Sequence, residues 1–200
     1  MPERCDNLRR MTTDRLPPLS PDALTDAQRL AADAIVNGPR GALYGPFVPL
    51  LRSPELMECA QRMGEYLRYR SALGQRLSEL VILLVARQWD QQVEWAIHAP
   101  IAVALGIDAR IVEAITVGRR PARMSDDESL VYDFSLEIIR RRAVGDATFG
   151  RVRERFGEQA LVDLLGLNGY YTFLAMVMNA AQTPAPESAA RPLPPLPIHR

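Results

Sequence analysis

Apolar positions along the chain recur every three to four residues, which is the period of an amphipathic helix. This pattern predicts helices over residues 25–37, 53–68, 76–87, 90–105, 108–118, 125–142 and 146–157, with a last, long helix that ends near residue 181. No segment shows the alternation of apolar and polar residues that is typical of a half-buried strand. The sequence therefore predicts an all-α fold.

Capping residues and helix breakers set the predicted helix boundaries. Ser125 begins the sequence of a capping box, and Asp90, Asp108 and Asp146 are predicted to cap the helices that follow them. The stretch 38–52 is rich in Gly and Pro and is predicted to be a loop.

The most apolar segment, residues 161–178, is long enough to be considered as a membrane span. Asp163 and Asn168 interrupt it, and Tyr170 and Tyr171 lie in its middle and not at interfacial ends. We therefore interpret the segment as a buried helix of a chain that does not enter a membrane. Because so apolar a helix is unsuited to the surface of a monomer, we expect it to pack against another subunit.

Proline-rich arms flank the predicted helical domain. We expect residues 1–22 to form an N-terminal arm, residues 23–182 to form one helical domain, and residues 183–200 to form a tail. The tail lacks the apolar periodicity of a packed element, so we expect it to be dispensable for folding, either flexible or lying on a neighbouring subunit. The N-terminal residues lack the apolar core of a signal peptide.

Composition narrows the range of functions. The 200 residues carry no net charge, which does not favour a nucleic-acid partner. All 24 basic residues are Arg, so mechanisms that need a Lys amine, such as Schiff-base chemistry and the nucleotide P-loop, are excluded. His98 and His199 are the two histidines, which argues against a multi-His zinc site. Cys5 and Cys59 lie far apart without a CxxC motif, which favours a reduced, cytoplasmic protein.

Candidate chemistry is concentrated in residues 76–100. Glu94 and His98 are spaced i, i+4 and share one helix face, while Glu79 lies in an otherwise apolar run of the preceding helix. A carboxylate among Leu, Val and Ile is costly unless it is paired, so antiparallel packing of the two helices is expected to bring Glu79 to His98. Burial is expected to favour neutral carboxyl groups and a neutral imidazole, ready for proton transfer near neutral pH.

Each of these residues also has a purely structural interpretation. His98 fits a core histidine bonded to a backbone carbonyl. Glu79 fits a buried ion pair with Arg76, and Glu94 fits an acidic residue in the first turn of a helix, where the dipole favours it. The sequence alone leaves both interpretations open.

The spacing from Glu79 to His98 resembles the motif of the alkylhydroperoxidase D-like family, E-x11-C-x-x-C-x-x-x-H, in a grouping that includes γ-carboxymuconolactone decarboxylases. The resemblance runs from about residue 45 to residue 182 and includes RLSELVILLVAR, EWAIHAPIA and FGEQALVDLLGLNGYY. It implies an all-helical bundle that assembles as a homotrimer or homohexamer, with a pocket near the subunit contacts.

The chain departs from this motif at the cysteines. The two family cysteines fall on Gln91 and Glu94, and the relay histidine of the peroxidase branch falls on Val93. A thiol peroxidase needs a thiolate and a resolving thiol, so the resemblance does not transfer peroxidase activity. Glu94 before His98 is instead similar to the decarboxylase branch, which pairs a Glu and a His at this place.

These observations predict a lyase or isomerase that uses no cofactor and no metal, with His98, Glu94 and Glu79 as catalytic residues acting on a small carboxylated or lactone-type substrate. Trp95, Phe47, Tyr170 and Arg87 are predicted to contact the substrate, and Arg52 and Arg70 are further candidates for a carboxylate clamp. Two alternatives remain: a metal-dependent enzyme with a Glu/Glu/His site, and an oligomeric ligand-binding module without catalysis.

Overall fold

The computed structural model describes residues 14–38, 40–186 and 192–194. Throughout these residues the regular structure is helical, which confirms the predicted all-α class. After a 3-10 turn at Pro21–Ala23, the helices are α1 (Asp26–Val36), α2 (Phe47–Leu50), α3 (Pro54–Tyr69), α4 (Gln75–Gln88), α5 (Gln92–Ala104), α6 (Ala109–Thr116), α7 (Asp126–Arg141) and α8 (Asp146–Ala181).

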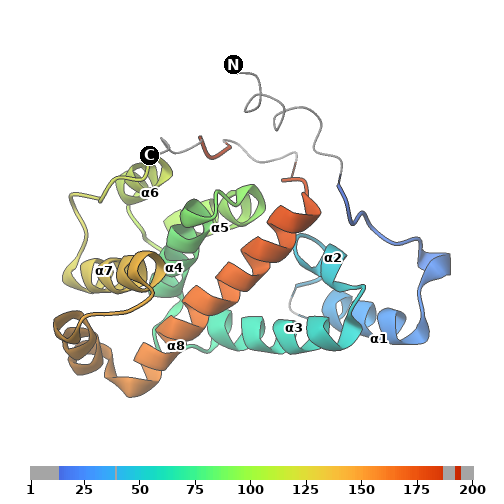
Figure 1. Cartoon of the computed structure of the whole chain (residues 1–200), viewed down its shortest axis with the longest axis horizontal. Coiled ribbons are helices and arrows are strands. Elements are labelled where there is room, and N and C mark those ends of the chain that lie inside the picture. The colour runs from blue at the N-terminus through green and yellow to red at the C-terminus, as the bar shows by residue number, and fades with distance from the viewer. Residues whose placement is uncertain (1–13, 39, 187–191, 195–200) are drawn as a thin grey trace, which may run out of the picture.

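Helix α4 forms the centre of the protein. It is buried continuously from Leu77 to Arg87 and packs against α5, α7 and α8. Figure 1 shows α8 running diagonally across the molecule, with α3 and α1 on one side and α7 on the other. A helix that is apolar on nearly all its faces must be surrounded by protein, so the composition of α4 dictates its central place.

Helix α8 contains the apolar segment and is divided into two helical parts. Gly157 has φ 82°, a left-handed conformation that suits glycine, and it separates a short first part from the long second part. By length and composition alone the helix could cross a membrane, but 56% of its apolar 18-residue window is buried inside the protein. The segment therefore belongs to the helical core of the fold.

Most predicted boundaries are correct to within a residue or two, with three local differences. The predicted loop 38–52 contains the single turn α2, in which Phe47, Pro49 and Leu50 are buried. Gly145 takes the N-cap of α8, and Asp146 is its first helical residue. Asp90 is not a cap: it has φ 50°, and the N-cap of α5 is Gln91, whose side-chain oxygen accepts hydrogen bonds from Val93 N at 2.6 Å and Glu94 N at 3.3 Å.

Two described residues of the C-terminal tail, Leu193 and Pro194, contact the helical domain of their own chain. Leu193 is 4% exposed, and its backbone N–H and C=O pair with the side-chain amide of Gln92 at 2.8 and 3.2 Å. Arg87 donates to the carbonyl of Pro194 at 2.8 Å. Hydrogen bonds to a side chain thus hold residues 193 and 194 where apolar periodicity is absent, and the dispensability of the tail for folding stays a prediction.

We expect Leu193→Ala to destabilise the fold, because the substitution removes a buried side chain and loosens the pairing with Gln92. Burial of one leucine is worth roughly 1.5–3 kcal/mol, which corresponds to a fall of several degrees in Tm for a chain of this size. Calorimetry of Leu193→Ala beside Leu30→Ala, whose leucine is 72% exposed, provides the test. Equal melting temperatures for both variants would contradict the docked tail.

Candidate functional site

The packing of α4 against α5 brings three ionisable side chains together. Oε2 of Glu79, on α4, lies 2.6 Å from Nδ1 of His98, on α5. Oε2 of Glu94, one turn before His98, lies 3.2 Å from Nε2. All three side chains are at most 5% exposed. The imidazole is therefore held between two carboxylates, one at each ring nitrogen.

These carboxylates decide the charge of the imidazole. Burial disfavours the charged form, but the hydrogen bonds and charges of Glu79 and Glu94 outweigh it and raise the pKa of His98 above 6.5. The direction of this pKa shift favours the imidazolium and is opposite to the one expected from burial alone. Two carboxylates on one ring stabilise the imidazolium more than loss of water destabilises it.

A third charge completes the cluster. Nε of Arg68, near the end of α3, lies 3.7 Å from Oε1 of Glu79, so this carboxylate faces a guanidinium as well as the imidazole. Glu79 is thus paired with two cations, and the predicted ion pair with Arg76 is not formed, because Arg76 pairs with Glu128. These two partners offset the free-energy cost of burying the Glu79 carboxylate among apolar residues.

Aromatic side chains wall the cluster. The ring of Tyr171 meets the edge of His98 at a centroid distance of 5.4 Å, and Tyr170 stands edge-on to Tyr171 at 5.2 Å. Burial raises the pKa of Tyr171 well above 10 and that of Tyr170 to about 12. Both phenols therefore stay neutral near pH 7, and Tyr171 forms an uncharged wall beside the imidazole.

A small cavity of about 20 Å³ adjoins Glu94 and His98. It has room for about one water molecule. Its lining consists of three aromatic side chains, two arginines, the His–Glu pair and three further apolar residues: Tyr44, Phe47, Tyr171, Arg40, Arg68, Glu94, His98, Pro46, Ile97 and Leu174. Glu79 does not line the cavity and lies behind the imidazole.

Two of the predicted substrate-contact residues lie at or beside this cavity. Phe47 is one of its walls, and Tyr170 stands behind Tyr171. Trp95 is buried in the core and is not part of the lining.

The three arginines that the sequence suggested are used elsewhere. Arg87 donates to the carbonyls of Thr116 and Pro194 and pairs with Asp90, so its guanidinium anchors the tail. Arg52 donates to backbone carbonyls of the N-terminal segment, and Arg70 lies over the ring of Tyr66. None of the three lines the cavity, because each is held by partners outside it.

Arg40 and Arg68, the two arginines that line the cavity, could not be identified from local sequence motifs. Helical spacing offers a signal for Arg68, which follows Gly64 by one turn on the buried face of α3. Arg40 lies in the Gly-Pro stretch before α2, and its position depends on contacts between segments distant in sequence. No periodicity in the sequence reports such contacts.

The positions of the family cysteines have structural and chemical roles in this chain. Gln91 caps α5, and its amide donates to Oδ1 of Asn179 at 2.8 Å, which ties the start of α5 to the end of α8. Glu94 holds Nε2 of His98, and Val93 is buried. Cys59 is exposed on α3, and Cys5 lies outside the described residues.

The geometry does not suit a metal ion. Glu79 and Glu94 contact opposite nitrogens of one imidazole, so the three side chains do not point to a common centre. Within the described part of the chain, no group of three or more His, Cys, Asp or Glu side chains is arranged to hold a metal.

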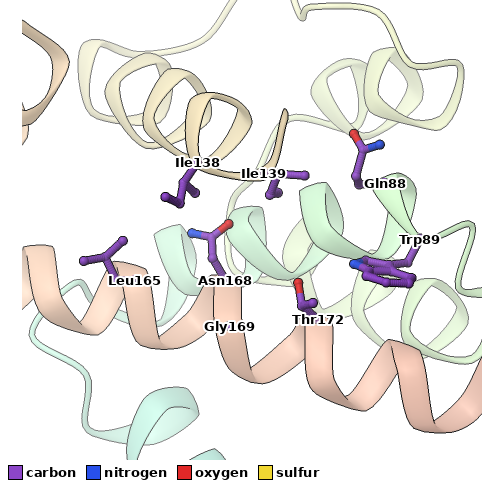
Figure 2. Close-up of a pocket in the computed structure, with 8 residues that line it drawn as sticks. All are labelled: Gln88, Trp89, Ile138, Ile139, Leu165, Asn168, Gly169 and Thr172. Atoms are coloured by element: carbon purple, nitrogen blue, oxygen red, sulfur yellow. The ribbon is translucent and has the colours of Figure 1, made fainter. Parts of the chain in front are cut away.

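A larger hollow lies away from this cluster. A groove of about 480 Å³ lies between α4, α7 and α8, and Figure 2 shows the side chains that line it. Uncharged side chains line it: Gln88, Trp89, Ile138, Ile139, Leu165, Asn168, Gly169 and Thr172. Without a titratable group the groove offers no acid–base chemistry, so the smaller cavity is the better candidate for catalysis.

We expect the stability of the fold to fall as pH rises through the titration of His98. Its pKa is raised in the folded state, so its contribution is fully present below about pH 6.5 and is lost above the folded-state pKa. Urea unfolding between about pH 6 and about pH 9, with 15N NMR of labelled histidine, measures both quantities. Glu94→Gln removes one carboxylate and should lower the pKa of His98. A His98 pKa at or below 6.5 in the original protein would contradict the stabilisation of the imidazolium by the two carboxylates.

Comparisons with known proteins were made by sequence and by structure. The sequence matches no protein-family description and no curated protein. The structure is similar to an uncharacterized peroxidase-related protein from Silicibacter sp. TM1040, with TM-score 0.72 and 15% identity over 90% of this chain and 94% of that one.

A second solved structure has the same similarity. It is the alkylhydroperoxidase AhpD core of an uncharacterized peroxidase-related protein from Ralstonia eutropha JMP134, with TM-score 0.72 and 16% identity over 86% of this chain and 92% of that one. At such identities the likeness concerns the fold. The chain therefore has the AhpD-like all-helical fold that its resemblance to the alkylhydroperoxidase D-like family implied.

Proposed function

We propose that the chain is a cofactor-independent lyase or isomerase that uses His98 and Glu94 for proton transfer on a small carboxylated or lactone-type substrate. The observation that carries this proposal is the buried Glu79–His98–Glu94 cluster, of which only His98 and Glu94 border a cavity. A buried acid–base pair beside a cavity is the arrangement that proton transfer requires.

Each member of the cluster has a distinct role in this proposal. Glu79 accepts the Nδ1–H of His98 and fixes the orientation of the ring, so it is a positioning residue. The Nε2–H of the imidazolium is the proton donor at the cavity. Glu94 accepts that hydrogen bond in the free protein and is the base for a proton taken from the substrate.

In the lyase form, the bond between the substrate and its departing carboxylate breaks, and CO2 leaves. The electron pair passes into a conjugated lactone carbonyl, because no cofactor accepts it. Nε2 of His98 then donates its proton to the substrate carbon. In the isomerase form, Glu94 removes a proton from one carbon and His98 supplies one to another, so the proton count is unchanged.

The cavity must enlarge when a substrate binds. Its volume of about 20 Å³ holds about one water, whereas sites for small molecules span roughly 300–1,000 Å³. We expect side chains that line the cavity to move, and Tyr44 is the most exposed aromatic residue among them. Closure around a substrate would exclude water from the acid–base pair.

The same proposal excludes thiol peroxidase chemistry. Gln91 and Glu94 occupy the positions of the two family cysteines, and Cys59 is exposed on another helix. Neither a thiolate nucleophile nor a resolving thiol therefore borders the cavity among the described residues. A reduced, cytoplasmic setting fits this chemistry and the AhpD-like fold.

We also propose that the protein is a homotrimer or homohexamer. Helix α8 exposes apolar side chains at Val162, Leu165 and Met176. Leu165 also lines the groove of Figure 2, so the exposed face of α8 continues into an apolar hollow. Contiguous apolar surface of this kind is typical of a subunit contact.

We expect His98→Gln to lower kcat by about a hundredfold or more, the usual contribution of a general acid–base, and Glu94→Gln to do the same. Glu79→Gln keeps a hydrogen-bond partner for Nδ1 but removes its charge, so it should lower kcat less and shift the pH profile toward lower pH. Turnover of conjugated lactones and small carboxylic acids by the three variants provides the measurement.

The matched control is Cys5→Ser with Cys59→Ser, which should leave turnover unchanged. Full activity in folded His98→Gln would contradict the acid–base assignment, and lost activity in the folded cysteine variant would restore thiol chemistry. If the protein binds small acids without converting any of them, the non-catalytic ligand-binding module is favoured.

For the assembly, light scattering at micromolar concentration should report a trimer or a larger oligomer. Met176→Arg places a charge in the exposed apolar row of α8 and should shift the protein toward smaller species without unfolding it. Arg62→Glu, on exposed α3 surface, is the control. A monomer in the original protein would refute the proposed assembly.

A further inference from the structure

Arg40 lines the cavity without a carboxylate partner. Its Nε donates to Oε1 of Gln61 at 2.5 Å, and its guanidinium lies 4.5 Å from the centroid of the Phe47 ring. Among the described residues it forms no ion pair. A guanidinium that is positioned at a cavity and has no carboxylate partner is suited to bind an anion.

Gly64 makes this position possible. A Cβ atom at residue 64 would lie 2.1 Å from the hydroxyl of Tyr170 and 3.0 Å from Nη2 of Arg40. The backbone of α3 therefore leaves the space in which Arg40 and Tyr170 come together. The placement of Arg40 is built into the core packing and is not an accident of a surface side chain.

Arg68 approaches the same cavity from α3. Its side chain is 13% exposed, and its Nε is 3.7 Å from Glu79, which is too long for a hydrogen bond. Its guanidinium also lies 5.3 Å from the ring of Tyr69. Arg68 therefore neutralises Glu79 only through space and retains donors that can bind a ligand.

The lining of the cavity carries an excess of positive charge. Among the residues that line the cavity, the two guanidinium groups of Arg40 and Arg68 stand against one carboxylate, that of Glu94. Excess charge in a largely enclosed site attracts an ion of opposite sign.

We propose that Arg40 and Arg68 form an anion-recognition pair that binds a carboxylate of the substrate beside Glu94 and His98. This inference deepens the proposed function and rests on it for the location of the site. The pair fixes the substrate by its charged end, so that a carbon next to the carboxylate faces Nε2 of His98.

The chemistry of the pair also says which carboxylate it binds. Two guanidinium groups stabilise the charge of a carboxylate, and that charge disappears when the group leaves as CO2. Binding the departing group would therefore stabilise the ground state more than the transition state and would slow the reaction. The carboxylate held by Arg40 and Arg68 is one that the reaction leaves in place.

Acetate and its uncharged counterpart acetamide are suitable probes, because both are small and differ mainly in charge. Titration calorimetry, with 15N NMR of His98, should show saturable binding of acetate and none of acetamide at the same concentrations. Arg40→Gln and Arg68→Gln should each weaken acetate binding at least tenfold. Arg40→Lys and Arg68→Lys should retain part of the affinity, because lysine keeps the positive charge but cannot form the two parallel hydrogen bonds of a guanidinium.

Arg62→Gln is the matched control, since Arg62 lies on the same helix as Arg68 with its side chain 69% exposed. It should bind acetate as the original protein does. No acetate binding by the original protein, or unchanged binding in folded Arg40→Gln and Arg68→Gln, would overturn the inference. If a glutamine variant does not fold, the lysine variants provide the test. An acetate affinity equal to that of the original protein would then overturn the proposed recognition by two guanidinium groups.

The binding experiment is independent of turnover. Arginine-dependent acetate binding without catalysis of any acid tested would uphold the anion site and refute the lyase or isomerase. Catalysis that depends on His98 with normal KM in the arginine variants would uphold the proposed function and refute the anion site.

Discussion

The contact of Glu79 with His98 is the interaction on which the structure of the site depends. It joins α4, the most buried helix, to α5, and it places a charged hydrogen bond where water is excluded. A buried charge that loses its partner is strongly destabilising, so the two helices must meet in a register that satisfies it. The same register carries Glu94 to the opposite nitrogen, and fold and site share one constraint.

Local patterns in the sequence were sufficient for the helices and for much of the cluster. Helical periodicity and capping residues such as Ser125 act between near neighbours, and the structure follows them closely. Glu79 was recognisable because a lone acid in an apolar run requires a partner, and His98 because it shares a helix face with Glu94. These inferences need only the spacing within two helices.

Contacts between distant segments could not be predicted in this way. Arg40 reaches the cavity through the packing of its loop on α3, and Leu193 is held by Gln92 from 101 residues away. The direction of the pKa shift of His98 could not be predicted for a different reason. Burial and the two carboxylates act in opposite directions on its pKa, and their balance depends on distances that a sequence does not contain.

The cap of α5 has a consequence for the residues that this helix turn can accept. Gln91 closes the first turn of α5 and ties it to Asn179, while Glu94 balances the imidazolium. Installing two cysteines at these positions would therefore remove a helix cap, an interhelical tie and a buried counter-charge in the same step. A pair of cysteines at this helix turn would therefore require compensating changes on α8 and around His98.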